Sequence, residues 1–534
     1  MVSSYAITWL YSDLRTTRIG SIFLAIGAVA GGAMPVSFEF PANVRTALDC
    51  ITAAQLKGDL SFLASDALAG RYTPSPGLDV AAEFIASRFR AAGLEAGGND
   101  GYFQTAAMID RRQPAPSANM TLHDGDKTFT ITARNYVVLN SSKAEKITNA
   151  RAAIFPVIDI EALKKTDVTG KAVVIAQPEF NKLPSGQRLA AYQNMRAFER
   201  LVAASKAAIE IVVINHAPSA PRPALMPAEE LPLHQVAAIA ATDNGLEEWF
   251  QHAQGTRLKT VTVDVPAPQE QAFTGKNVIG ILRGSDPKLK DAAVLLTAHY
   301  DHIGTMATAA GLTLDKPKPN DQIFNGANDD GSGTVSVIEI ASALAHLDPH
   351  PKRSLIFMTF FGEERGELGS RYYGKHPVFP IAKTVADINL EQVGRTDELD
   401  NGKIVSRVNS ATLTGFDYSD VTKFLEQAGK ELGVNVYKDN EASDAYFTRS
   451  DNDALAQQGV PAHSLTVAFD YPDYHGLGDE WQKIDYENMA RVDRMVALGL
   501  LGVANAEKAP EWNTQNSKTV PFREARKQSI GADK

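Results

Sequence analysis

Two adjacent glutamates, Glu363 and Glu364, directly follow an apolar run and precede a glycine-punctuated turn. Neighbouring residues at the end of a strand project in different directions, so one carboxylate can bind a metal ion while the other reaches a bound water molecule. A Glu-Glu pair alone is most often a solvated surface patch. Its position between an apolar strand and a turn makes this pair a candidate for hydrolytic chemistry.

Two further segments carry residues that suit a metal ion. His299 and Asp301 are two residues apart on a chain expected to be extended, so both side chains point the same way. This arrangement is typical of an imidazole ligand and a carboxylate that orients it.

Asp329 and Asp330 lie in a glycine-rich turn before a predicted helix. Two acids would repel phosphate, so we interpret the turn as a cation site. An acidic helix cap would account for one aspartate but hardly for both.

The last two segments contain Glu391 and His475, and each is a weak signal in isolation. Taken together, the five segments supply two histidines and several carboxylates without a cysteine. Such an oxygen and nitrogen ligand set suits zinc, with manganese or cobalt as substitutes. One carboxylate can bridge two cations, so the set indicates a two-metal hydrolase.

Cys50 is the only cysteine of the chain, and we expect a buried structural thiol there.

The elements that must position these residues form a repeated strand, loop and helix pattern after Asn277. Strands are predicted at 293–298, 354–361, 385–390 and 462–467, and a helix at 334–347. Strands that are continuous apolar runs separated by helices indicate an α/β fold with a mainly parallel sheet covered by helices on both faces. In such folds ligands bind at the carboxyl ends of the strands, where the candidate residues lie.

The residue composition changes along the chain, which predicts several domains and segments. Arg15 and Arg18 precede an apolar stretch at 19–33 that fits a secretory signal and is too short to span a membrane comfortably. Short β-rich runs bounded by glycine and proline predict a small α/β domain inserted into a larger one. The predicted parts are a signal peptide at 1–34, a helical segment of the catalytic domain at 45–113, the insertion at 114–270, the catalytic domain at 271–507 and a loosely attached polar tail at 508–534.

The charge balance excludes one class of partner. With 53 Lys and Arg against 63 Asp and Glu, the formal net charge is -10, which argues against a nucleic-acid partner. The predicted signal implies an exported protein, periplasmic or extracellular in a bacterium, without a stable membrane span after the signal is removed. The oligomeric state is left open.

The ordered motifs resemble a known family. His-x-Asp, Asn-Gly-Ala-Asn-Asp-Asp-Gly-Ser-Gly, Gly-Glu-Glu-x-Gly-x-x-Gly-Ser, Asn-Leu-Glu-x-x-Gly-Arg and Tyr-His are similar to those of the zinc exopeptidase family that includes bacterial leucyl aminopeptidases, aminopeptidase Y and glutamate carboxypeptidase. The resemblance covers about 275–504 and extends to 60–71. The insertion is similar to a protease-associated domain at 170–175 and 204–214.

The resemblance implies a co-catalytic pair of zinc ions acting on a peptide or small aminoacyl substrate. His299 and Glu391 would hold one zinc, Glu364 and His475 the other, and Asp329 would bridge them. Many relatives have aspartate where this chain has Glu391, which could alter how that carboxylate binds and which metal it prefers.

The resemblance also implies how a proton would move. Glu363 would act as general base, taking a proton from a water that bridges the zinc ions and passing it to the departing amine. Asp301 would support the site from behind His299, and Tyr446 or Tyr474 would donate to the oxyanion. Asn452 replaces a histidine common in the family, which puts a role for that position in doubt.

Several functions remain open from the sequence. An aminopeptidase is the leading interpretation, by analogy with signal-bearing relatives. A carboxypeptidase or a glutaminyl cyclase of the same family, the latter with one zinc, is an alternative. A receptor or scaffold that has lost its metals is another, although no motif position is visibly lost here.

Overall fold

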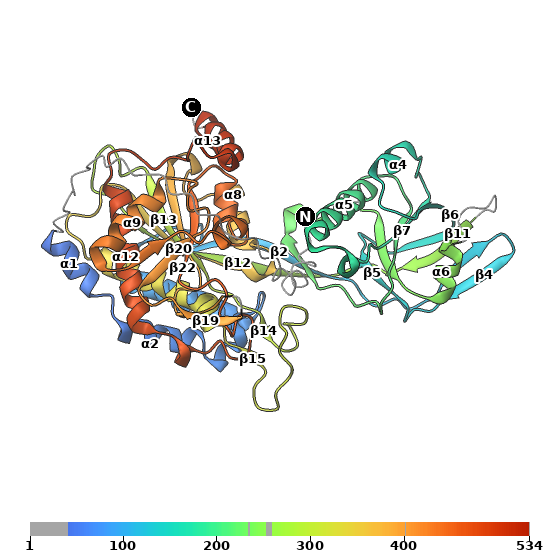
Figure 1. The fold of residues 1–534 in the computed structure, drawn as a ribbon, viewed down its shortest axis with the longest axis horizontal. Coiled ribbons are helices and arrows are strands. Elements are labelled where there is room, and N and C mark those ends of the chain that lie inside the picture. The colour runs from blue at the N-terminus through green and yellow to red at the C-terminus, as the bar shows by residue number, and fades with distance from the viewer. Residues whose placement is uncertain (1–40, 233–234, 252–258, 401, 533–534) are drawn as a thin grey trace, which may run out of the picture. The chain divides into compact units, whose positions relative to one another are not determined.

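The computed structural model describes residues 41–232, 235–251, 259–400 and 402–532 (Figure 1). The described chain divides into two compact units: unit 1 contains the residues up to Ala106 and those from Thr274 onward, and unit 2 contains Ala107–Phe273. The predicted signal peptide lies outside the described residues. Among the described helices, none is long and apolar enough to cross a membrane.

Unit 1 is built on a mixed sheet. β13 pairs in parallel with β16 and β17, and β17 pairs in parallel with β22, while β12 and β20 run antiparallel to their neighbours β16 and β22. The central strands are therefore parallel within a mixed sheet, and the expected α/β fold is confirmed. In spatial order the strands are β21 (Asn435–Tyr437), β20 (Ser410–Leu413), β22 (Ala462–Thr466), β17 (Thr384–Leu390), β13 (Ala293–His299), β16 (Ser354–Phe360), β12 (Gln269–Leu282) and β2 (Phe103–Arg112), and β1 (Glu95–Ala96) pairs with β12.

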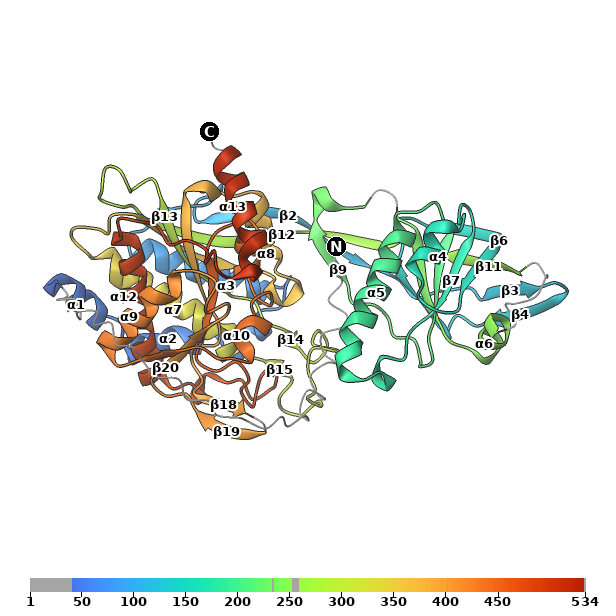
Figure 2. The same ribbon diagram turned by 45° about the horizontal axis from the view of Figure 1, so that its top comes forward.

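Helices cover both faces of this sheet, because every residue of β13, β16 and β17 is buried and each strand needs apolar cover on two sides. One layer contains α2 (Ala53–Leu63), α3 (Pro76–Ala91), α7 (Gly333–Ala345) and α12 (Tyr486–Asn505), with α9 (Val421–Leu432) packed on α12. The opposite layer contains α8 (Leu368–Lys375), α11 (Asn452–Ala456) and α13 (Val520–Ala532). Figures 1 and 2 show α8 and α13 lying together, away from α2.

Short elements lie at the edges of unit 1. Near the candidate site, β14 (Gly304–Thr305) pairs with β15 (Ile323–Phe324) at the base of a long loop. β18 (Asp397–Asp400) pairs with β19 (Lys403–Ser406), and the short helices are α1 (Ala42–Asp49) and α10 (Ala442–Ala445).

Unit 2 has its own sheet and its own apolar core. Helix α5 packs Phe198 and Val202 against one face of the sheet, whereas α6 buries Leu246 and Trp249 on the other. In spatial order its strands are β4 (Lys127–Ile131), β3 (Met120–Asp124), β11 (Lys259–Val265), β6 (Glu145–Phe155), β7 (Ala172–Ala176), β8 (Ile209–Val213), β10 (Ala237–Ala241) and β5 (Tyr136–Asn140), and its helices are α4 (Ile160–Lys165), α5 (Ser185–Ala203) and α6 (Asn244–Gln251). The short strand β9 (Ala224–Pro227) pairs with the end of β2.

The limits of unit 2 differ from the predicted insertion at 114–270. The chain enters unit 2 within β2 and leaves it within β12, so each boundary falls inside a continuous strand. Strand composition does not change at such a point, which is why the sequence places the limits several residues away. The likeness to a protease-associated domain stays a prediction.

Two expectations are wrong. The tail at 508–534 is not loosely attached over its described part: Trp512 and Phe522 are buried in the core of unit 1 and stack on each other with ring centroids 5.0 Å apart. Two aromatic residues are enough to fix a mostly polar segment, because each buries a large apolar surface. Cys50 is exposed at the end of α1, so it is not a buried structural thiol.

Candidate metal centre

All seven predicted site residues converge at the carboxyl ends of the central strands of unit 1. His299 is the last residue of β13, Glu391 directly follows β17, and Glu363 and Glu364 form a 3-10 turn after β16. Asp329 lies in the π-helical turn Ala327–Ser332 that leads into α7. The parallel order of these strands is the reason why segments far apart in the sequence meet at one edge.

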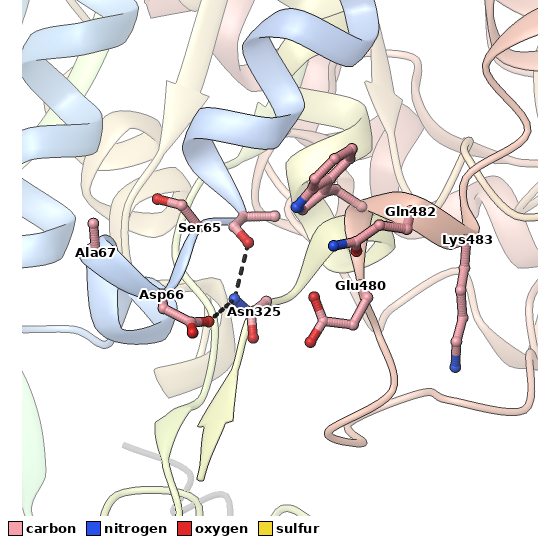
Figure 3. A pocket seen from close by; sticks show the side chains of 9 residues that line it. Ser65, Asp66, Ala67, Asn325, Glu480, Gln482 and Lys483 are labelled. Atoms are coloured by element: carbon pink, nitrogen blue, oxygen red, sulfur yellow. Dashed lines mark hydrogen bonds between the residues drawn. The ribbon is translucent and has the colours of Figure 1, made fainter. Parts of the chain in front are cut away.

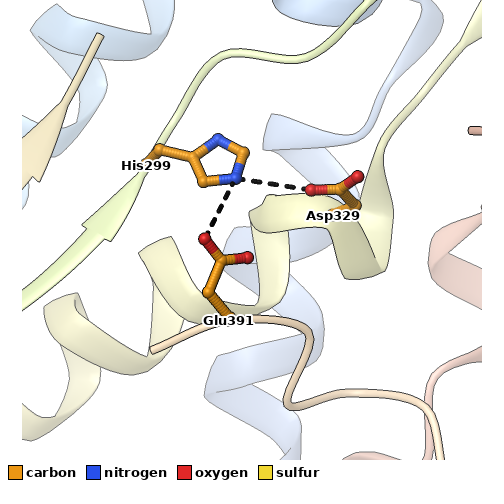
Figure 4. A group of neighbouring side chains, drawn as sticks. All are labelled: His299, Asp329 and Glu391. Carbon is orange, nitrogen blue, oxygen red and sulfur yellow. Dashed lines mark ion pairs between the residues drawn. The ribbon is translucent and has the colours of Figure 1, made fainter. Parts of the chain in front are cut away.

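The first group of ligand atoms surrounds the Nε2 atom of His299 (Figure 4). This atom lies 3.3 Å from Asp329 Oδ1 and 3.6 Å from Glu391 Oε1. Glu363 Oε2 is 4.0 Å away from the same nitrogen. The other ring nitrogen, Nδ1, lies 3.2 Å from the backbone oxygen of Asp301. That contact turns Nε2 toward the carboxylates.

The second group surrounds the Nε2 atom of His475, which lies 3.2 Å from Asp329 Oδ2 and 3.1 Å from Glu364 Oε1. Its Nδ1 lies 3.0 Å from the backbone oxygen of Leu312, on the loop between β14 and β15. The two oxygens of Asp329 therefore face two different histidines, as a bridging carboxylate would require.

His302 is a residue that the sequence analysis did not single out. Its side chain is fully buried, and its Nδ1 lies 3.0 Å from Glu364 Oε1 and 3.9 Å from Asp329 Oδ2. Its position directly after Asp301 could have indicated a role in the site, but adjacent side chains on an extended chain usually point in opposite directions. Only the path of the chain after β13 brings the His302 ring next to Glu364.

Hydrogen bonds hold the acidic turn in place. Asp330 does not face the two groups: its carboxylate accepts hydrogen bonds from the backbone N–H groups of His299, Gly333 and Gln392. It thus ties three segments of the site together. Asp479 accepts hydrogen bonds from the backbone N–H groups of Asn328 and Asp329 at 2.9–3.1 Å, so the backbone of the bridging residue is fixed as well.

Asp301 supports both the imidazole and the glutamate turn. Its Oδ1 accepts a hydrogen bond from the backbone N–H of Glu363 at 3.0 Å, and its Oδ2 accepts one from the Thr73 hydroxyl at 3.0 Å. The side chain is fully buried. Asp301 therefore fixes the position of Glu363 relative to His299.

The two departures from the family pattern belong to one buried network. The Ser450 hydroxyl donates to the Glu391 carboxylate, and the Asn389 amide donates to the hydroxyls of Ser450 and Ser464, both at 2.9 Å. Ser464 in turn donates to Asn452 Oδ1 at 2.8 Å. Asn452 therefore acts here as a hydrogen-bond acceptor behind Glu391, away from the ligand atoms.

The chemistry of the donor set fits metal ions. Several of its atoms are buried and make no hydrogen bond: Asp329 Oδ2, Glu364 Oε1, His475 Nε2 and both ring nitrogens of His302. Buried polar atoms without a partner are rare and costly, so their convergence indicates a site for a cation. They belong to carboxylates and imidazoles, which are the ligands that zinc takes in proteins.

The electrostatics separate the two adjacent glutamates. Burial raises the pKa of Glu364, but the combined effects of His475 and His302 outweigh it and lower that pKa to about 2. Burial raises the pKa of Glu363 well above its usual value. The negative charges of Glu364, Glu391 and Asp451 raise it further, and the positive charge of His299 only partly offsets these effects. Among the histidines, burial opposes the imidazolium of His299, yet Glu391 and its other acidic neighbours raise that pKa well above 6.5. Glu363 thus holds protons far more readily than its neighbour.

The two tyrosines considered as oxyanion donors differ in position. The Tyr474 ring stacks on the His475 ring with centroids 4.1 Å apart, which places it beside the second group. Tyr446 packs against Phe469 and Arg449. Their proposed role stays a prediction.

A separate hollow of about 670 Å³ lies beside the end of α2 (Figure 3). The Asn325 amide donates to the backbone oxygen of Ala64 and to Asp66 Oδ1, both at 2.9 Å, and Glu480 and Trp481 form the facing wall. None of the seven predicted residues lines it. The hollow is therefore distinct from the candidate centre.

The fold and the site define an α/β protein whose catalytic unit gathers histidines and carboxylates at the carboxyl ends of parallel strands, as hydrolytic metalloenzymes do. The profile of Peptidase family M28 matches residues 277–499. The match covers the part of the chain that carries the candidate centre, and it confirms the resemblance to zinc exopeptidases.

Solved structures and curated proteins are also similar to this chain. The aminopeptidase from Aneurinibacillus sp. strain AM-1 is 20% identical with a TM-score of 0.55, covering 87% of this chain and 97% of that chain, so the two share a fold. A vacuolar membrane protease from Tuber melanosporum is 28% identical over 215 residues, which are 39% of this chain and 19% of that relative. A probable zinc metalloprotease from Pyrenophora teres is 26% identical, covering 52% of this chain and 60% of that relative. The match to the vacuolar proteases spans about a fifth of their length.

The names of the curated relatives contradict the predicted cellular location of this protein. The expectation of an exported bacterial protein, periplasmic or extracellular, is wrong, because curated relatives of this chain are vacuolar membrane proteases of fungi. An apolar stretch flanked by arginines does not identify the organism or the compartment, which is why the sequence argument failed at this point.

Proposed function

We propose that this protein is a two-metal aminopeptidase that uses zinc. The observation that carries the proposal is the position of Asp329, whose two carboxylate oxygens each face one histidine at 3.2–3.3 Å. His299 and Glu391 would hold one ion, and Glu364 and His475 the other. Zinc bound there would polarise the scissile carbonyl and make water a stronger acid.

Glu363 is the proposed general base. Its carboxylate lies 4.0 Å from His299 Nε2 at the edge of the first group, without being one of the nearer ligand atoms. Because burial and neighbouring acids raise its pKa, it is suited to take a proton from water and to return it to the departing amine. The hydrogen bond from its backbone N–H to Asp301 fixes this geometry.

The excess of negative charge favours a free amino group in the substrate. Glu363, Glu391 and Asp451 act on one another as neighbouring negative charges. Such surroundings attract an ammonium group and repel a terminal carboxylate. Arg365, the cation next to Glu364 in the chain, lies over the Tyr72 ring and donates to its hydroxyl. These observations favour an aminopeptidase over a carboxypeptidase.

The test of the base is Glu363→Gln. We expect turnover of an aminoacyl chromogenic substrate to fall by about 10²–10⁴-fold, because a positioned acid–base group contributes that much, while two zinc ions stay bound. Glu367→Gln is the matched control, since Glu367 is an acid of the same turn that accepts a hydrogen bond from Arg371 instead. Unchanged turnover by Glu363→Gln would show that the base is wrongly assigned.

A substrate profile tests the aminopeptidase assignment. We expect peptides with a free N-terminus to be cleaved and their N-acetylated counterparts to remain intact. Cleavage of N-blocked peptides from the carboxyl end would favour the carboxypeptidase, and release of pyroglutamyl products would favour the cyclase.

A further inference from the structure

His302 is a buried histidine whose hydrogen bonding is not satisfied within the described part of the protein. The residue is 0% exposed, and neither ring nitrogen makes a hydrogen bond. Buried polar groups without a partner are rare and costly, so a protein retains one only for a reason. The ring nitrogen Nδ1 points at Glu364 Oε1, 3.0 Å away, and this carboxylate oxygen also makes no hydrogen bond.

The distances fit a tetrahedral ion. His302 Nδ1 lies 3.0 Å from Glu364 Oε1 and 3.9 Å from Asp329 Oδ2. His475 Nε2 lies 3.1 Å from Glu364 Oε1 and 3.2 Å from Asp329 Oδ2. A tetrahedral zinc with bonds of about 2.0–2.1 Å separates its ligands by roughly 3.3 Å. With Glu364 Oε1 the group has four atoms, which completes that geometry.

The surrounding backbone is shaped to leave room for this ring. Gly326 lies against it: a Cβ atom at this position would come within 2.4 Å of His302 Cγ. Gly326 also has a φ of +57°, which glycine adopts most readily. On the other side, the backbone N–H of His302 donates to the backbone oxygen of Arg71 at 3.2 Å. The ring is therefore held where it is by two segments that are distant in sequence.

The first group differs from the second. Around His299 Nε2 lie two ligand oxygens, from Asp329 and Glu391, and His299, Asp329 and Glu391 make a group of three that could hold an ion. Structural zinc sites usually have four protein ligands, whereas catalytic sites usually have three.

We propose that His302 is a fourth protein ligand of the ion held by Glu364, His475 and Asp329, so that the two metal positions are unequal. This inference rests on the proposed two-metal function. An ion held by these four side chains would be bound more tightly than one held by His299, Asp329 and Glu391 alone.

The experiment titrates the metal-free full-length protein with Zn²⁺ against a competing chelator. The starting variant is Glu391→Ala, which disables the His299 position and leaves one tight ion. The second substitution is His302→Leu, in which a side chain of similar size replaces the imidazole but cannot bind metal. We expect it to lower the affinity for that ion by more than about 100-fold, because loss of a group that merely orients a ligand already lowers metal affinity about 10–100-fold.

His463→Leu is the matched control in the same Glu391→Ala background. His463 is equally buried but hydrogen-bonds Ser419 and Thr414 away from the centre, so its loss tests the effect of removing a core histidine. Its zinc affinity should remain unchanged. Circular dichroism of each metal-free variant checks folding, and His302→Ala repeats the test with a smaller side chain.

The outcomes separate the two proposals. Equal zinc affinity with and without His302 overturns the inference, and its ring is then only a packing partner of His475. If the unmodified protein itself binds no zinc, the two-metal function fails and the inference fails with it. If it binds two ions and only the His302 variants lose the tight one, both proposals are supported.

Discussion

Glu363 and Glu364 are neighbours in the chain, yet the structure gives their carboxyl groups opposite properties. Burial raises the pKa of both, but His302 and His475, 3.0 and 3.1 Å from Glu364, together lower the pKa of Glu364 to about 2, whereas acidic neighbours raise that of Glu363 further. A carboxylate that stays ionised suits a cation, and one that accepts protons suits general-base chemistry. The difference arises from the partners of each side chain and not from the residue type.

A buried acid remote from the metal centre predicts a pH-dependent stability. Burial raises the pKa of Asp493, on α12, from 3.8 to about 8; Glu339 adds to the shift, while Ser336 and Arg494 oppose it. The unfolded chain releases this proton near pH 3.8 and the folded protein only near pH 8. The stabilisation is therefore fully present below pH 3.8 and is lost as the pH rises toward 8, by up to about 1.4 kcal/mol per pH unit.

Asp493→Asn should remove this dependence. We expect the variant to gain stability over the original protein progressively between pH 5 and pH 8, measured as the free energy of unfolding of unit 1 in urea. The exposed Glu431→Gln serves as control. A stability difference that stays constant over this pH range would contradict the prediction.

At the level of elements, the described C-terminal segment is part of the core of unit 1. Trp512 stacks on Phe522 of α13, and its indole N–H donates to the backbone oxygen of Gly459 at 2.9 Å. These contacts fasten α13 to the layer that contains α8 and α11. A segment that carries two such anchors contributes to stability even though most of its residues are polar.

Trp512→Ala should destabilise unit 1 by about 3–5 kcal/mol, the usual cost of truncating a buried tryptophan. Trp512→Phe keeps the stacked ring and loses the hydrogen bond, so we expect a loss of less than half as much. The measurement is denaturant unfolding followed by circular dichroism. Equal small effects of both substitutions would mean that the segment is not anchored.

At the level of the whole molecule, the two units have separate cores. Phe198 and Trp249 belong to clusters that lie within unit 2, whereas Trp512 and Phe522 belong to one within unit 1. The candidate metal residues all lie in unit 1. Metal binding at the candidate centre would therefore stabilise unit 1 directly.

Calorimetry of the full chain should show two unfolding transitions. Removing metal with a chelator should lower the transition of unit 1 and leave that of unit 2 in place, because a ligand present at 100 times its Kd stabilises the state that binds it by about 2.7 kcal/mol. His475→Ala should reduce the response to the chelator. A single transition, or equal shifts of both, would contradict this expectation.

The sequence by itself determined which segments approach one another. Apolar runs alternating with helices predict parallel strands, whose carboxyl ends share one edge, so His299, Glu363 and Glu391 could be expected to meet. The family motifs then implied a role for each residue. This reasoning depends on local patterns and on the topology that they allow.

Only the tertiary structure decided how the remaining side chains are used. It brings His302 into the second group, turns Asp330 back to tie three segments, places Asn452 in a network behind Glu391, and buries Trp512. Each outcome depends on contacts between segments that lie far apart in the chain, and a side chain's direction and burial follow from those contacts, which no local pattern contains.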